Sequence, residues 1–190
     1  MHTLIVKAHP SSKGFTHRIA DAYKRGKESK GDTVEVLDLY KTDLQQPFLA
    51  FENIREDLSK PDPVRAQIQE KITKADNIVF VHPLWWVGMP AILKNFIDVN
   101  FSAHFAFKYV NGRPVGLLKG KTSSVFITCD GSLWIYRLLT MPFKTIWKYP
   151  ILRLCGLKVQ AFEVFDKKLF RSEAEQEAFL KKVESIAVRS

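Results

Sequence analysis

The sequence predicts an α/β fold in which helices cover both faces of a parallel β-sheet. Short apolar segments alternate along the chain with longer segments that carry the three- and four-residue spacing of amphipathic helices. Continuous apolar runs such as Ile78–Val81 are typical of strands that are buried on both faces of a sheet. Right-handed connections between such strands produce a doubly wound, three-layer α/β/α sandwich.

Five segments are expected to form the sheet, and most are bounded by turn-forming residues. They are Leu4–Val6, Thr33–Leu39, Ile78–Val81, Lys121–Thr128 and Val159–Val164. A parallel sheet of this size fits the flavodoxin-like strand order 2-1-3-4-5, which places a ligand crevice at the carboxyl ends of strands one, three and four. We expect residues 1–190 to form a single domain.

The connections between these strands contain the expected helices. They cover Phe15–Lys30, Pro63–Ala75, Pro90–Phe101 and a final helix through Val188, for which Ser172 and Glu175 supply a capping box. Three other segments are less regular. Tyr40–Pro63 is punctuated by prolines, Phe101–Val115 is rich in aromatic residues and contains an Asn111-Gly112 turn, and Trp134–Trp147 is apolar, ambiguous and broken by Pro142.

The composition excludes several classes of protein. A formal net charge of +9 favours solubility or the attraction of anions such as phosphorylated cofactors, but the basic residues are scattered and form no nucleic-acid-binding signature. No apolar run approaches the roughly 18 residues of a membrane span. The sequence begins without a signal peptide, so we expect a cytoplasmic protein. Cys129 and Cys155 lack metal-ligand spacing and are expected to be plain thiols.

The loop after the first strand has the character of an anion site. Neither the G-x-G-x-x-G nor the Walker phosphate motif occurs in the chain. Instead Ser11, Ser12, Gly14 and Thr16 surround the start of a helix, whose free N–H groups and dipole favour a phosphate. A serine before a helix also serves as an ordinary cap. His9 either pairs with a phosphate or hydrogen-bonds a backbone carbonyl.

The most informative segment follows the third strand. After His82-Pro83 the chain presents Leu84-Trp85-Trp86 in a short turn, and Gly88-Met89-Pro90 then leads into a helix. Two adjacent tryptophans in a loop need a surface to cover, and at the carboxyl end of a strand a flat aromatic ligand is the usual one. Filling of an aromatic core is the alternative.

Several other residues keep two interpretations. His82 and His104 are either structural or functional. Phe105, Phe107 and Tyr109 alternate as in an extended arm, which either packs locally, closes a pocket or forms a dimer interface.

The segment Pro83–Lys94, followed by Phe101-x-x-x-Phe105-Ala106-Phe107-x-Tyr109, resembles the NAD(P)H:quinone oxidoreductase family. These are flavodoxin-like flavoenzymes that include bacterial quinone reductases and ancillary subunits of potassium-efflux systems. The resemblance covers nearly the whole chain. The other matching segments occur in the expected order and are Ala8-His9-Pro10, Phe15-Thr16, Thr128–Ser132 and Leu154–Leu157.

The resemblance implies a homodimer with two flavin sites at its interface, FAD or FMN as cofactor and NAD(P)H as electron donor. His9, Phe15 and Thr16 would hold the phosphate-bearing tail of the flavin. Its isoalloxazine ring would lie along Pro83, Leu84, Trp85, Trp86 and Val87. The far edge of the ring and the ribityl chain would contact Thr128, Cys129, Asp130 and Gly131. The substrate would lie beside Trp86 and Trp134, under Phe105 and Phe107 of the partner subunit.

The chain also departs from the family pattern. Trp85 replaces a glutamine of the animal quinone reductases, so one polar contact with the ring is missing, and Cys129-Asp130-Gly131 replaces a threonine-glycine-glycine run. Trp134 stands approximately where those enzymes have a tyrosine. Tyr136, two residues on, is our candidate catalytic residue, as a hydrogen-bond donor. The histidine that follows in those enzymes has no clear counterpart, which argues against a tyrosine-histidine proton relay.

The resulting hypothesis is hydride transfer from NAD(P)H through the flavin to a quinone or similar acceptor, by a ping-pong mechanism in one shared pocket. One alternative is a redox-sensing regulatory subunit of a membrane partner such as a potassium-efflux system. Another is an electron carrier, although carriers are usually acidic and lack a roofed pocket. Likeness to the animal enzymes slightly favours FAD, while bacterial relatives of this length also use FMN. No metal is implied.

Overall fold

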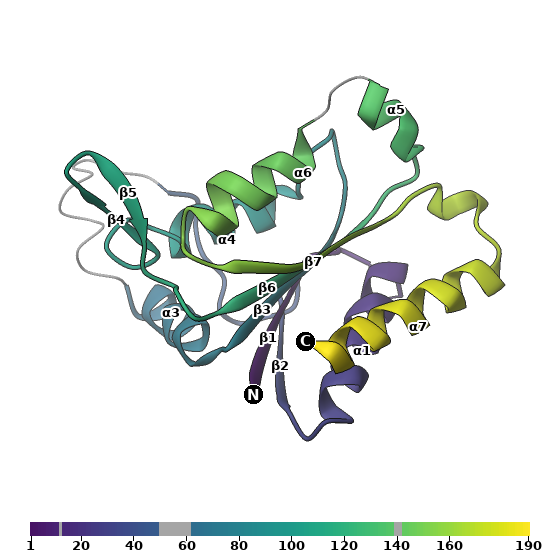
Figure 1. The fold of residues 1–190 in the computed structure, drawn as a ribbon, viewed down its shortest axis with the longest axis horizontal. Helices are drawn as coiled ribbons and strands as arrows, with labels where there is room; N and C mark the ends of the chain where they lie inside the picture. Colours follow the sequence, from purple (N-terminus) through teal and green to yellow (C-terminus); the bar gives the residue numbers. More distant parts are fainter. Residues whose placement is uncertain (12, 50–61, 139–141) are drawn as a thin grey trace.

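A five-stranded parallel sheet forms the centre of a computed structural model, which describes residues 1–11, 13–49, 62–138 and 142–190. The strands are β1 (His2–Lys7), β2 (Thr33–Asp38), β3 (Asn77–Pro83), β6 (Thr122–Thr128) and β7 (Lys158–Phe165). They lie in the order β2-β1-β3-β6-β7, and each neighbouring pair is parallel (Figure 1). This arrangement confirms the predicted order 2-1-3-4-5 and the α/β sandwich.

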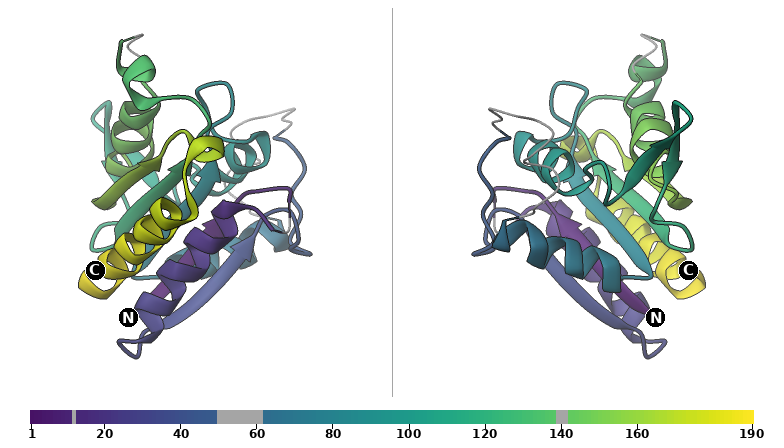
Figure 2. Two further views of the ribbon diagram at one scale, coloured as in Figure 1. Left: turned by 90° about the vertical axis from the view of Figure 1, so that its right-hand side faces the viewer. Right: turned by 90° about the vertical axis from the view of Figure 1, so that its left-hand side faces the viewer.

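Helices cover both faces of this sheet (Figures 1 and 2). One face packs against α1 (Phe15–Glu28) and α7 (Glu173–Arg189), and the other against α3 (Pro63–Lys74) and α4 (Ala91–Asn100). Alternate residues of a strand point to opposite faces of the sheet and pack into two separate hydrophobic clusters. Ile5, Val79 and Phe126 pack with α1 and α7, whereas Leu4, Phe80 and Ile127 pack on the opposite side. The strands are therefore apolar at consecutive positions because both of their faces are buried.

The ends of the helices follow the local chemistry of the sequence. Ser172 and Glu175 form the predicted capping box at α7, and the Asp62 carboxylate caps α3 by accepting from the backbone N–H of Arg65 at 3.0 Å. Helix α4 begins at Ala91, directly after Pro90. Among the described residues, no helix combines the length and the apolar character that a bilayer span requires.

Strand β3 lies at the centre of the sheet, and all of its residues are buried. It extends to Pro83, two residues beyond the predicted Val81, because the ladder to β6 continues through the pairs His82–Ile127 and Pro83–Thr128. The next residue, Leu84, is also hydrogen-bonded to the end of β6, since its backbone N–H donates to the Thr128 carbonyl at 2.7 Å. The chain therefore leaves β3 beside the end of β6.

The aromatic-rich segment forms an antiparallel hairpin of β4 (Phe107–Val110) and β5 (Arg113–Gly116). Asn111 and Gly112 form its turn with φ of 50° and 75°, the left-handed conformation that a two-residue hairpin turn requires. The base of the hairpin lies against the chain just before β7. A Cβ atom on Gly116 would fall 2.3 Å from the backbone carbon of Cys155. The hairpin is therefore anchored near the amino end of β7.

The described residues of the ambiguous apolar segment, together with those that follow it up to Arg153, form short helices. They are α5 (Leu133–Leu138), α6 (Phe143–Ile146) and the π-helix η1 (Trp147–Arg153), which contains Pro150. Trp147 is buried, with ring centroids 4.8 Å from Phe80 and 5.4 Å from His82. The aromatic residue that follows α6 is therefore part of the core. Residues 139–141 and much of the predicted irregular segment Tyr40–Pro63 lie outside the described residues.

The burial of His82 makes the stability of the protein depend on pH. Its Nδ1–H donates to the Pro83 carbonyl at 2.8 Å, and Nε2 has no hydrogen-bond partner in the described structure. Burial lowers the pKa of His82 to about 4. Because an unfolded histidine has a pKa of about 6.5, the unfolded state binds a proton first as the pH falls. The stability that the neutral His82 contributes is therefore fully present above about pH 6.5, and it is lost progressively as the pH falls to about 4.

We predict that this group alone removes roughly 2 kcal/mol of unfolding free energy between pH 7 and pH 5. Urea unfolding at both pH values, for the wild type and for His82→Asn, measures the contribution. The variant should be less stable at pH 7 but lose less stability on acidification. The exposed His104, replaced by Asn, is the matched control and should keep the wild-type pH dependence. Equal losses in His82→Asn and the wild type would contradict the prediction.

Candidate functional site

Three loops meet at the carboxyl edge of the sheet, as the predicted crevice requires. The side chains of Thr16, in the first turn of α1, and Thr128, at the end of β6, are buried with their Oγ1 atoms 3.4 Å apart. The Leu84–Thr128 backbone hydrogen bond joins the ends of β3 and β6. The structure therefore brings the loops after β1, β3 and β6 together.

The amino end of α1 offers free hydrogen-bond donors. Its N-cap residue is Gly14, no side chain caps the helix among the described residues, and the first turn contains no acidic residue. A Cβ atom at Gly14 would lie 2.8 Å from Cε1 of His9, so glycine lets the imidazole pack onto the backbone. The free N–H groups and the helix dipole favour an anion beside His9.

The hydrogen bond of His9 fixes which of its nitrogens can donate. Nδ1 accepts from the backbone N–H of Ser11 at 3.1 Å, so this nitrogen does not hydrogen-bond a carbonyl, which was one of the two interpretations of His9. Burial lowers the pKa of His9, and the charges of His17 and Lys168 act in the same direction. The imidazole is therefore neutral near pH 7, with its proton on Nε2. Ser12, which the sequence analysis placed in this anion site, lies outside the described residues.

Two basic residues near this loop, His17 and Lys168, were not predicted from the sequence to belong to the site. His17 is buried, its Nε2–H donates to the Ser11 carbonyl, and its ring centroid lies 5.8 Å from that of His9. Lys168 follows β7; its backbone N–H donates to Cys129 at 3.0 Å, and its Nζ is 3.9 Å from Asp130. The parallel order could have revealed Lys168, because the fifth strand ends at the same edge.

The two tryptophans lie in a tight turn that extends beyond the sheet. The backbones of Trp85 and Gly88 exchange two hydrogen bonds, of 2.9 and 2.8 Å. Trp86 and Val87 at the centre of the turn have φ of 50° and 61°. This left-handed conformation is costly for bulky and β-branched residues. Trp86 is fully exposed and Trp85 is partly exposed, so filling of the core does not explain Trp86.

The loop after β6 forms the other side of the site. Thr128 and Cys129 are buried, Asp130 is exposed, and a Cβ atom on Gly131 would lie 2.4 Å from the hydroxyl of Tyr136. Burial raises the pKa of Tyr136, with Cys129 and Asp130 acting in the same direction, so Tyr136 is a neutral hydroxyl. Burial also raises the pKa of Cys129 to about 12, which makes it an unreactive thiol near neutral pH.

The position of this loop depends on Asp166, which the sequence reasoning did not single out. Its carboxylate accepts from the backbone N–H of Leu133 at 2.9 Å and pairs with Arg171 at 2.8 Å. The first residue of α5 is thereby held beside the end of β7. Trp134 is the next residue along α5, and its side chain is exposed.

The structure does not bring Phe105 and Phe107 to the strand-end loops of their own chain. Both side chains are partly buried against the core, and Phe107 contacts Tyr109 edge-to-face with centroids 5.8 Å apart. They lead into a hairpin that is anchored near the amino end of β7, opposite the predicted crevice. Figure 1 shows this hairpin at the far side of the molecule from α5.

Comparison with known proteins agrees with this geometry. A family model described as "Flavodoxin-like fold" matches residues 1–187. A Haemophilus influenzae protein named an uncharacterized NAD(P)H oxidoreductase is 34% identical over 170 residues, which cover 87% of this chain and 83% of that protein. The chain belongs to the flavodoxin-like NAD(P)H:quinone oxidoreductase family. It is therefore an oxidoreductase.

Other relatives match over most or all of the chain. The FMN-dependent NADH:quinone oxidoreductase 2 of Listeria innocua is 33% identical over 152 residues, which cover 70% of each chain. The crystal structure of Smu.1420 from Streptococcus mutans superposes with a TM-score of 0.88 at 31% identity and covers 100% of both chains. The sequence resemblance and the fold therefore agree.

The left-handed conformation of Trp86 should cost stability in the protein without ligand. Asparagine tolerates this conformation better than tryptophan, and the exposed ring makes little contact to lose. We predict that Trp86→Asn raises the free energy of unfolding by about 0.5–1 kcal/mol. Urea denaturation measures the change. Trp134→Asn, at an exposed position within α5, is the control and should give no gain. A loss in Trp86→Asn equal to that in the control would contradict the prediction.

Proposed function

We propose that the protein is a flavin-dependent NAD(P)H oxidoreductase that transfers two electrons to quinones or similar acceptors. One observation carries the proposal: the exposed, strained Trp85–Gly88 turn lies at the same sheet edge as an uncapped helix terminus. The turn suits a flat aromatic ring, and the helix terminus suits an anion. A flavin phosphate combines the two in one molecule.

The anionic end of the flavin would lie at the amino end of α1. His9 would donate from Nε2, since its Nδ1 is occupied by Ser11, and Thr16 would offer its hydroxyl. Phe15 anchors the helix by packing on Phe165, with ring centroids 4.6 Å apart. The absence of a carboxylate in the first turn removes a source of repulsion. The residues present therefore fit a phosphate.

The ring would lie between the other two loops. Pro83, Leu84, Trp85, Trp86 and Val87 would line one side, and Thr128, Cys129, Asp130 and Gly131 the other. Bound there, the flavin would supply the hydride-accepting chemistry. Tyr136 would donate a hydrogen bond from its neutral hydroxyl beside Gly131 and stabilise negative charge at the reduced ring. Trp86 and Trp134 would hold the nicotinamide or the quinone by stacking and exclude water.

A homodimer would complete this pocket. Phe105 and Phe107 lie away from the strand-end loops of their own chain, so they can contribute only to the site of another copy. Tyr109 and Val110 on the same hairpin are exposed and provide apolar surface for such a contact. We infer that Phe105 and Phe107 of the partner subunit roof the pocket.

Of the two flavins, we propose FMN. The Listeria innocua relative is FMN-dependent by name, which supports this choice over the slight preference for FAD that the sequence suggested.

The proposed contact between His9 and the flavin phosphate can be tested directly. His9→Leu removes the Nε2 donor and should weaken FMN binding by about tenfold, the effect of one charge-assisted hydrogen bond.

Riboflavin, which lacks the phosphate, provides the matched ligand for this test. Its affinity should be equal in the wild type and in His9→Leu, as measured by quenching of flavin fluorescence. His9→Gln retains an N–H donor and should recover part of the FMN affinity. If His9→Leu weakens riboflavin as much as FMN, His9 supports the fold of the loop and does not hold the phosphate.

A pocket shared by donor and acceptor at the strand ends would give ping-pong kinetics. The donor must leave before the acceptor enters, because both would stack at Trp86 and Trp134. Steady-state rates measured with NADPH and a soluble quinone should therefore give parallel double-reciprocal lines. Lines that intersect would show a ternary complex and would contradict a shared pocket.

A further inference from the structure

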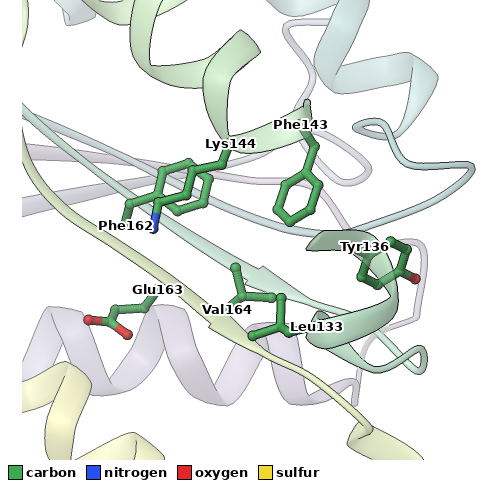
Figure 3. Close-up of a pocket in the computed structure, with 7 residues that line it drawn as sticks. All are labelled: Leu133, Tyr136, Phe143, Lys144, Phe162, Glu163 and Val164. Atoms are coloured by element: carbon green, nitrogen blue, oxygen red, sulfur yellow. The ribbon is translucent and has the colours of Figure 1, made fainter. Parts of the chain in front are cut away.

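A cavity of about 240 Å³ lies beside the strand-end site, between α5, α6 and β7. Its apolar walls are Leu133 of α5, Phe143 of α6, and Phe162 and Val164 of β7 (Figure 3). Tyr136, Lys144 and Glu163 complete the lining. This volume is below the roughly 300–1,000 Å³ of pockets for drug-sized ligands. It therefore suits a molecule of one ring or two fused rings.

The charges around the cavity favour an anion. Lys144 has no carboxylate within ion-pair distance in the described part of the chain, and its Nζ lies 5.3 Å from the centroid of the Phe162 ring. The carboxylate of Glu163 is already paired with Lys182 at 2.7 Å. Figure 3 shows Lys144 beside Phe162, with Phe143, Leu133 and Val164 grouped around the adjoining space. The cavity is therefore bordered by apolar side chains, by one cation without an ion-pair partner among the described residues, and by one carboxylate that is already paired.

Tyr136 separates this cavity from the strand-end site. Its ring lines the cavity and meets Phe143 edge-to-face, with centroids 5.9 Å apart. Its hydroxyl lies against Gly131, which belongs to the strand-end loop. A ligand in the cavity would thus occupy one side of Tyr136 while the strand-end site occupies the other.

We propose that this cavity is a second binding site, for a small aromatic carboxylate. The ring of the ligand would pack among Leu133, Phe143 and Val164, and its carboxylate would face the ammonium of Lys144. The cavity adjoins the proposed flavin site at Tyr136, and Phe143 also lines a smaller cavity together with Leu84 and Val87.

The test uses 1-naphthoate as the probe and the neutral 1-naphthalenemethanol as its matched control. Isothermal titration of the wild-type protein should show one naphthoate per chain, with the same affinity in the presence and absence of saturating FMN. The alcohol should bind about fivefold more weakly, because it lacks the charge that Lys144 would pair. Binding of naphthoate that disappears when FMN is added would place the probe at the strand-end site and overturn the proposal.

Two variants locate the probe. Lys144→Met should reduce the affinity for naphthoate to that for the alcohol and leave the alcohol unchanged, whereas Lys148→Met, one helical turn further on, should change neither. Leu133→Trp should fill the cavity and abolish both interactions, with circular dichroism confirming that the variant is folded. Lack of binding at millimolar concentration, or a naphthoate preference that survives Lys144→Met, would contradict the proposal.

Discussion

The position of β3 between β1 and β6 is the constraint on which the rest of the structure depends. Every residue of β3 is buried, and its ladders on both sides fix the register of the three strands whose loops form the candidate site. A shift by one residue would turn every buried side chain to the opposite face. The register therefore determines where Leu84 meets Thr128, and with it where the tryptophan turn begins.

After Leu84 the chain adopts a backbone conformation that costs energy. Trp86 and Val87 lie in the left-handed region, and the two hydrogen bonds between Trp85 and Gly88 hold them there. A fully exposed tryptophan contributes little to the folding of the single chain, so the turn adds stability only when a ligand or another copy covers it. The neighbouring loops offer complementary groups, with free N–H donors at α1 and the neutral Tyr136 hydroxyl beside Gly131.

Much of this arrangement could be predicted from the sequence because it depends on local patterns. Continuous apolar strands such as β3 identified the parallel sheet, Ser172 and Glu175 identified the start of α7, and Asn111-Gly112 identified the hairpin turn. Other features depend on contacts between distant residues. The packing of Trp147 on His82 and the contact of Tyr136 with Gly131 carry no signal in local sequence. The π-helix around Pro150 was missed for a different, local reason, since proline ordinarily ends a helix.

The central claim is that this sheet edge binds a flavin and reduces it with NAD(P)H. The most direct measurement is an anaerobic titration of the FMN-loaded protein with NADPH, followed by visible absorption. The flavin band near ~450 nm should bleach after about one NADPH per flavin, because the flavin accepts one hydride. A protein that retains no FMN on gel filtration, or that binds FMN without bleaching, would contradict it.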